Sequence, residues 1–218
     1  MQIQSPVVFT IPLFGGIPVT MTVVVEWIIM AVLIVAASAV TKGWKLVPEG
    51  TQNMVELIIE GFNKFVKNSL GDYWKDYTPY LGTVAAFLIL ANTISIFGLV
   101  PPTKDISATS ALALMSIVTV VIASIKARGV KGYAKYFFKS PINFFINVLD
   151  LFTRPLSLAA RLFGNIFAAV TIMGLIERAV PIVLPAVFSI YFDLFDGLLQ
   201  MLVFVFLTML YIQEAIEE

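Results

Sequence analysis

The sequence predicts an all-α integral membrane protein, and three observations lead to this fold class: an apolar composition, long apolar segments and few charged residues. Of the 218 residues, 59% are hydrophobic and 13% are charged. One soluble core cannot cover that much apolar surface, so we expect long helices in a lipid bilayer. The chain contains no cysteine and no histidine, so we expect no disulfide, no bound metal and no cofactor. A membrane enzyme is the class of protein that fits least well.

Five segments are apolar and long enough to cross a hydrocarbon core of about 30 Å. They cover approximately residues 17–41, 79–100, 108–125, 142–180 and 186–214. Residues 51–68 instead predict an amphipathic helix at the membrane interface, because their apolar side chains share one helical face. That face consists of Val55, Ile58, Ile59, Phe62, Phe65 and Val66. We find no internal repeat or linker, so residues 1–218 are expected to form a single integral membrane domain.

The last two segments exceed the length of a perpendicular crossing. At 1.5 Å per residue, helices of about 39 and about 29 residues extend about 58 Å and 43 Å. We therefore expect two long, tilted helices that form an antiparallel hairpin, with its turn at Pro181 and Pro185.

The basic residues predict the orientation. Ten of the 14 Lys and Arg residues lie in two loops on one side, against Lys104 and Arg178 on the other. By the positive-inside rule these loops are cytoplasmic, so the amino terminus lies outside and the carboxyl terminus lies in the cytoplasm. We expect a multi-pass protein of the cell inner (plasma) membrane, and the net charge of zero argues against nucleic-acid binding.

Polar residues form a stripe along the fourth segment, because they follow at steps of 4, 3, 4, 3, 4 and 4 residues. The stripe consists of Asn143, Asn147, Asp150, Arg154, Ser157, Arg161 and Asn165. Arg161 lies near the middle, where an arginine costs at least about 2.5–3.5 kcal/mol on insertion scales. Such a residue by default marks an ion or substrate pathway; the alternative is a structural arginine that pairs with another helix. For Asp150 and Arg154 a local ion pair is favoured over a channel gate.

The fifth segment carries a shorter stripe of Asp193, Asp196 and Gln200, at positions i, i+3 and i+7. The two stripes fade near the middle of the membrane from opposite sides. This pattern predicts two offset aqueous half-channels with Arg161 between them, because a continuous polar path would leak ions down the membrane potential. The alternative for the two aspartates is ordinary hydration at the outer interface.

Residues 155–168, PLSLAARLFGNIFA, resemble the arginine-bearing segment of subunit a of F-type ATP synthases, the stator subunit of their membrane sector. Residues 102–114 resemble the outer loop of that family and the start of its next helix, and residues 199–212 resemble its last helix. The RLFGN core is highly specific, and the resemblance covers nearly the whole chain after the first span.

The resemblance implies a non-catalytic subunit that couples ion flow to rotation and ATP synthesis. Arg161 matches the arginine that faces the ion-binding carboxylate of the rotating ring of subunit c, and Asn165 and Gln200 match its polar partners. Ser157 lies one turn before the arginine. The implied partners are the c-ring, the peripheral-stalk subunit b, the remainder of the ATP synthase and membrane lipids.

Two positions depart from the family pattern. Val170 stands where the family commonly has an acidic residue, and Asp193 stands where some members have histidine. We infer that the entry carboxylate has moved to the last helix, at Asp193 and Asp196. Glu26 is a weaker candidate for the outer half-channel, with structural hydrogen bonding as its alternative. Protons are the expected ion, and sodium ions remain open.

A self-contained secondary transporter or channel is the alternative function. Such a protein normally has inverted repeats or helices broken by glycine and proline in matching halves, and neither is visible in this sequence. A membrane scaffold without transport does not account for the charged groups at mid-helix.

Overall fold

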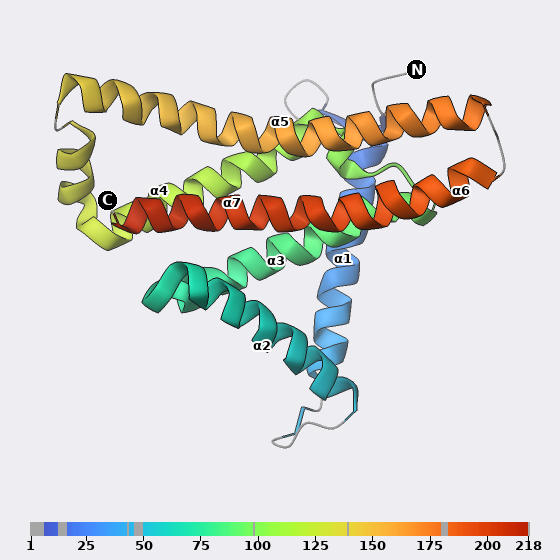
Figure 1. Cartoon of the computed structure of the whole chain (residues 1–218), viewed down its shortest axis with the longest axis horizontal. Coiled ribbons are helices and arrows are strands. Elements are labelled where there is room, and N and C mark those ends of the chain that lie inside the picture. Colours follow the sequence, from blue (N-terminus) through green and yellow to red (C-terminus); the bar gives the residue numbers. More distant parts are fainter. Residues whose placement is uncertain are drawn as a thin grey trace. The chain divides into compact units, whose positions relative to one another are not determined.

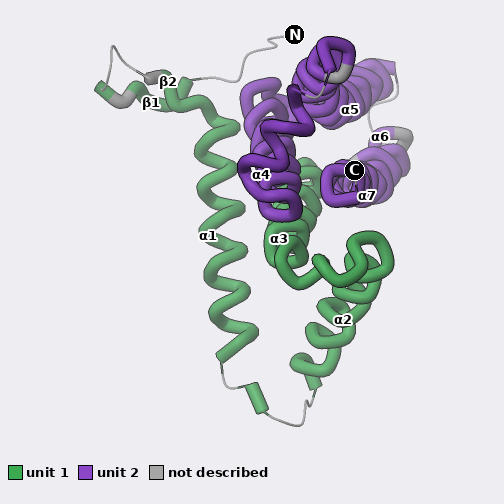
Figure 2. Tube along the Cα trace, turned by 90° about the vertical axis from the view of Figure 1, so that its left-hand side faces the viewer, with its two compact units in different colours: residues 1–102 green, residues 103–218 purple. Residues whose placement is uncertain are grey.

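The computed structural model describes residues 7–12, 17–42, 44–45, 50–97, 99–138, 140–179 and 183–217. Within this part of the chain, five helical stretches are long and apolar enough to span a membrane. Figure 1 labels the elements, and the two compact units are residues 1–102 and residues 103–218 (Figure 2). The protein is therefore a multi-pass, all-α membrane protein with a small β-hairpin added.

The β-hairpin opens unit 1. Strand β1 (Val7–Ile11) pairs antiparallel with strand β2 (Ile17–Thr20), and helix α1 (Met21–Thr41) follows directly. The first span was predicted to begin at about residue 17. Residues 17–20 form this strand instead, and the helix begins at Met21. Pro18 has no N–H to donate, and the β-branched residues around it favour extended backbone, so the segment joins a strand before the helix starts.

Helices α2 (Thr51–Leu70) and α3 (Trp74–Thr93) pack together in unit 1, and α1 packs on α3. Phe62 of α2 lies beside Gly82 of α3, where an added Cβ atom would make an ordinary van der Waals contact with its ring at 3.5 Å. Val25 and Ile29 of α1 are buried with Ala91 of α3.

One side of α2 carries large apolar residues that remain exposed. Met54, Leu57 and Ile58 are 69%, 70% and 71% exposed. An exposed ion pair joins Glu60 and Lys64 on the same helix, with a distance of 3.0 Å between the carboxylate oxygen and Nζ. Of the predicted apolar face, Val66 is buried and Ile58 is exposed. The location of α2 at the membrane interface stays a prediction.

Helix α4 (Ile106–Phe137) opens the helical part of unit 2 and is longer than the predicted span at both ends. Asp105 caps its start, because the carboxylate accepts a hydrogen bond of 3.0 Å from the backbone N–H of Ser107. The helix is interrupted at Gly129, where φ is 73° and ψ is 159°. Only glycine adopts this conformation readily, so Gly129 separates a long apolar helix from a short basic one.

Helix α5 (Pro141–Ala179) is the longest element, and it contains Pro155. Helix α6 (Val183–Ser189), a π-helical segment (Ile190–Asp196) and helix α7 (Gly197–Glu217) complete the chain. The expected turn at Pro181 lies outside the described residues, and Pro185 lies inside α6 and not in the turn.

Helices α5 and α7 run antiparallel beside each other, and α4 contacts both (Figure 1). Helix α4 carries several buried residues that are small or have a hydroxyl group, among them Ala113, Ser116 and Ala123. Ser116 and Thr208 of α7 join their hydroxyl groups at 3.5 Å. Small residues let the helix backbones approach closely, which holds α5 and α7 against a common support.

The conformation of Gly129 generates a prediction about stability. We expect Gly129→Ala to lower the free energy of unfolding by about 1–3 kcal/mol, because alanine is strained at this φ and ψ. Gly61→Ala, in the middle of α2 with open space around it, is the matched control and should raise stability by about 0.5–1 kcal/mol. Thermal unfolding in detergent measures both. Equal melting temperatures for the two variants would contradict the strain at Gly129.

Candidate functional site

Arg161 lies near the middle of α5 on a face of mostly small side chains. Ala160, Gly164 and Ala168 follow at intervals of four residues beside the polar row Ser157, Arg161 and Asn165. All six residues are exposed, and a Cβ atom added to Gly164 would meet no atom within 4 Å. Such a small-xxx-small pattern lets another helix approach closely, so this face is suited to contact with a second protein chain.

The guanidinium of Arg161 has no hydrogen-bond or ion-pair partner in the part of the chain that the structure describes. In a bilayer this is expensive, because a charged side chain needs a counter-charge, a polar partner or water. The arrangement is therefore incomplete without a partner from outside the described residues.

Asn165 and Gln200 meet one turn beyond Arg161 in α5. The Nδ2 group of Asn165 donates a hydrogen bond to Oε1 of Gln200, which joins α5 to α7. Gln200 is 2% exposed, and its own Nε2 group is buried without a hydrogen-bond partner among the described residues. The sequence analysis selected both residues, and the structure brings them together.

The other candidate residues are placed as follows. Ser157 is exposed on the face of Arg161, one turn earlier. Asp196 ends the π-helical segment and is half-buried, and Asp193 lies in the same segment, with a side chain outside the described part. Glu26 lies in α1 of unit 1, where it is half-buried and has an interaction partner. Val170 lies on α5, half-buried.

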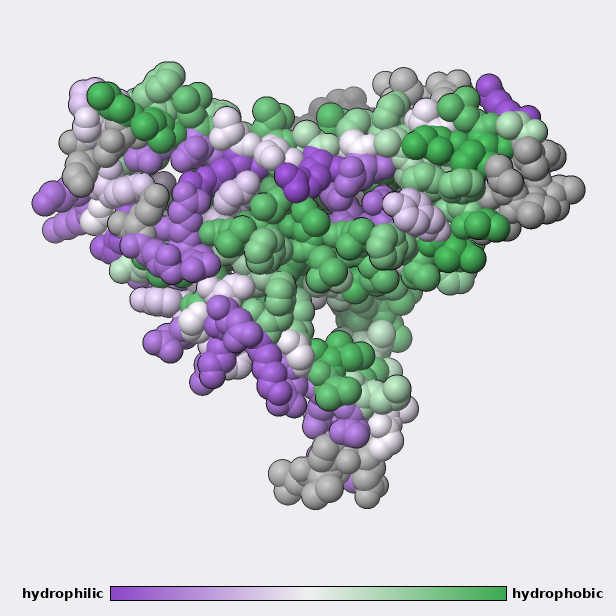
Figure 3. Space-filling model, viewed as in Figure 1, coloured by the Kyte–Doolittle hydropathy of each residue, from purple (hydrophilic) through white to green (hydrophobic). Residues whose placement is uncertain are grey.

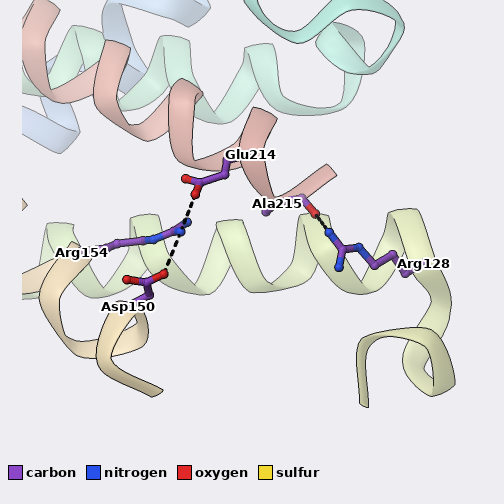
Figure 4. Close-up of polar contacts among 5 residues, drawn as sticks. All are labelled: Arg128, Asp150, Arg154, Glu214 and Ala215. Carbon is purple, nitrogen blue, oxygen red and sulfur yellow. Dashed lines mark hydrogen bonds and ion pairs between the residues drawn. The ribbon is translucent and has the colours of Figure 1, made fainter. Parts of the chain in front are cut away.

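A second polar cluster joins the other ends of α5 and α7. Arg154 lies between two carboxylates, with its Nη2 atom 3.3 Å from Asp150 and 3.0 Å from Glu214 (Figure 4). The side chain of Arg154 is 17% exposed, whereas both carboxylates are 45% exposed. The local pair with Asp150 was expected from the i, i+4 spacing. Glu214 was missed, because a contact between helices leaves no periodic signal in the sequence.

Arg128 completes this cluster from α4. It donates a hydrogen bond of 3.2 Å to the backbone carbonyl of Ala215, and its guanidinium lies 4.2 Å from the centre of the Tyr136 ring (Figure 4). Beside these residues is a cavity of about 140 Å³ between α4, α5 and α7. Its polar lining consists of Ser124, Arg128, Tyr133, Tyr136, Asn147, Asp150 and Arg154.

An apolar section of α5 and α7 separates the two polar contacts. Leu158 and Leu162 on α5 are 2% and 0% exposed, and Phe204 and Val205 on α7 are each 1% exposed. These residues lie between Arg154 and Asn165 on α5, and between Gln200 and Glu214 on α7. Tightly buried apolar side chains exclude water, and the buried hydroxyl groups of Ser116 and Thr208 lie in the same section.

Within the described residues, no group of three acidic, cysteine or histidine side chains could hold a metal ion. The chemistry available to unit 2 is therefore that of a fixed cation, amides, hydroxyl groups and individual carboxylates. Such a set can attract an anion and pass ions between carboxylates.

Comparison with known proteins gives a consistent result. The family described as ATP synthase A chain matches residues 19–213. A protein of Propionigenium modestum named "ATP synthase subunit a, sodium ion specific" is 36% identical, with 92% of this chain and 75% of the relative covered. "ATP synthase subunit a" of Gloeobacter violaceus is 36% identical over 90% of this chain and 84% of the relative. That of Moorella thermoacetica is 34% identical over 91% of each. With a family match over most of its length and relatives at this level of identity, the chain belongs to the ATP synthase A chain family.

Proposed function

We propose that this chain is the non-catalytic, ion-translocating stator subunit of an F-type ATP synthase. The observation that carries the proposal is an exposed guanidinium at mid-helix without a partner in the described chain. A membrane protein keeps such a group only where something outside the chain compensates for its charge. The ion-binding carboxylate of a rotating ring of subunit c supplies that counter-charge.

Arg161 acts as a fixed attractor for this carboxylate. As a ring subunit arrives, the guanidinium favours the deprotonated carboxylate, so the ion is released before the subunit passes. Arginine suits the task better than lysine, because a guanidinium keeps its charge in surroundings where the amine of a lysine can become neutral. Asn165 and Gln200 support the adjacent surface through their hydrogen bond, and Ser157 extends the polar row toward the opposite end.

Two half-channels give ions access to the ring from opposite sides of the membrane. The outer one is assigned to Asp193, Asp196 and Gln200 of the last membrane segment. The inner one follows the exposed face of α5 from Ser157. The buried residues Leu158, Leu162, Phe204 and Val205 support this separation, because tightly packed apolar side chains exclude water. An ion then crosses only on the moving ring.

The assembly includes the c-ring on the face of Arg161, the peripheral-stalk subunit b and the remainder of the ATP synthase. The protein lies in the plasma membrane with its amino terminus outside and its carboxyl terminus in the cytoplasm, as the basic loops predict. A self-contained transporter is the other candidate function. It would transport ions when reconstituted alone, whereas this subunit should be inactive without its ring.

Replacing the arginine tests the proposal directly. We expect Arg161→Ala to abolish ATP-driven ion pumping while the complex still assembles, because the ring carboxylate no longer meets a cation. Arg178→Ala, at the exposed end of the same helix, is the matched control and should pump at the normal rate. Pumping is measured in inverted membrane vesicles with a fluorescent dye that reports acidification. Normal coupled pumping in Arg161→Ala would refute the assigned role.

The two aspartates of the last membrane segment give a second prediction. We expect Asp193→Asn combined with Asp196→Asn to slow ion transport from the outer side, because amides do not accept and release protons. The Glu217→Gln change, on a carboxylate at the other end of α7, should leave the rate unchanged. ATP synthesis driven by an imposed ion gradient measures this step. Unchanged rates in the double variant would assign both aspartates to the hydrated surface.

The nature of the ion gives a third prediction. A proton needs one acceptor atom at a time, whereas a sodium ion needs several oxygen ligands at once, so single carboxylates favour protons. We expect ATP-driven pumping to persist in sodium-free buffer, and sodium not to protect the ring from carbodiimide modification. Sodium-stimulated ATP hydrolysis together with protection would instead assign sodium as the transported ion.

A further inference from the structure

The cavity between α4, α5 and α7 is a polar site to which the proposed function assigns no residue. Its volume of about 140 Å³ is well above the roughly 10–15 Å³ that one water molecule requires. It lies beside Arg154, on the far side of the apolar section from Asn165 and Gln200. The exposed apolar residues Ile146 and Leu151 also line it, so the cavity borders the lipid-facing surface of α5.

Two guanidinium groups lie beside two carboxylates here, and within the described residues Arg128 contacts neither carboxylate. Arg154 neutralises part of the charge of Asp150 and Glu214 by contacting both (Figure 4). Arg128 uses one N–H group on the carbonyl of Ala215. A guanidinium has five N–H groups, so Arg128 retains donors for an anion in the cavity.

Asn147 provides a second, independent indication of a ligand. Its Nδ2 group is buried and has no hydrogen-bond partner among the described residues. An unsatisfied buried donor costs about 1–3 kcal/mol, so an oxygen atom of a ligand or of water in the cavity would be stabilising. Together with the hydroxyl group of Tyr133, the free donors favour a ligand that carries several oxygen acceptors.

The surroundings of the cavity attract anions. Residues 126–139 contain Lys126, Arg128, Lys131, Lys135 and Lys139 and no acidic residue. Hydrophilic surface gathers at this end of unit 2, interleaved with hydrophobic surface (Figure 3). A basic pocket between membrane helices on the side predicted to be cytoplasmic is typical of sites for anionic lipid head groups.

We propose that this cavity binds the phosphate group of an anionic phospholipid. Arg128, Tyr133 and Asn147 donate hydrogen bonds to the phosphate oxygens, and the acyl chains lie along the exposed apolar side chains of α5, such as Ile146. The proposal depends on the membrane location of unit 2 and not on ion translocation, so it can fail while the proposed function stands. Free inorganic phosphate shares the same chemistry and is separated from lipid by the experiment.

The absence of cysteine from the chain allows a direct test. Ala215→Cys places a thiol on the cavity wall, and the complete ATP synthase carrying it is reconstituted in vesicles. The rate at which N-ethylmaleimide labels this subunit is measured in phosphatidylcholine alone, with added phosphatidylglycerol, and with added inorganic phosphate. We expect phosphatidylglycerol to protect the thiol, and inorganic phosphate not to. Protection by phosphate alone, or by neither addition, would overturn the lipid assignment.

Further variants test the individual donors. Half-protection should require about tenfold more phosphatidylglycerol in Arg128→Gln, because a charge-assisted hydrogen bond is lost. Asn147→Leu should also weaken protection, and it should fold well because it removes an unsatisfied buried donor. Lys131→Gln, on an exposed residue of the same basic segment outside the cavity, is the matched control. Equal effects of Arg128→Gln and Lys131→Gln, or full protection in Asn147→Leu, would overturn the site.

Discussion

The free energy of a guanidinium in a bilayer is the constraint on which unit 2 depends. Arg161 is exposed on α5, and the described residues offer it no partner. Arg154 lies seven residues earlier on the same helix and has two carboxylates. One arginine is thus satisfied within the chain and joins two helices, whereas the other is kept available. The proposed role of Arg161 rests on this contrast more than on the presence of either charge.

The hairpin of α5 and α7 holds Arg161 in place on the exposed face of α5. The Asn165–Gln200 hydrogen bond joins the helices on one side of Arg161, and the Arg154–Glu214 ion pair joins them on the other. Buried leucine, phenylalanine and valine side chains fill the section between. Polar contacts within a low-dielectric surrounding specify which residues face each other, because a shift along the helix axis would leave their polar atoms unpaired. The face of Arg161 is consequently held in one register.

The periodicity of the sequence predicted the features that depend on one helix alone. The five membrane segments, the amphipathic pattern of α2 and the polar row through Ser157, Arg161 and Asn165 follow from side-chain spacing of about 3.6 residues. Contacts between elements were beyond that reasoning. Glu214 reaches Arg154 from a helix far along the chain, and strand β2 forms only because β1 is available to pair with it. The resemblance selected Asn165 and Gln200 as partners of Arg161, and their hydrogen bond to each other was not predicted.

In the π-helical segment Ile190–Asp196, the direction of the side chains depends on the number of residues in the segment. A π-turn accommodates one residue more than the α-helix around it. Removing that residue would restore regular α-helix and rotate every preceding side chain by about 100° relative to α7, since one residue is 1/3.6 of a turn. An insertion or a deletion in this segment therefore changes the direction of its acidic side chains as effectively as a substitution does. A carboxylate in this segment can then change position while Gln200 keeps its hydrogen bond to Asn165 of α5.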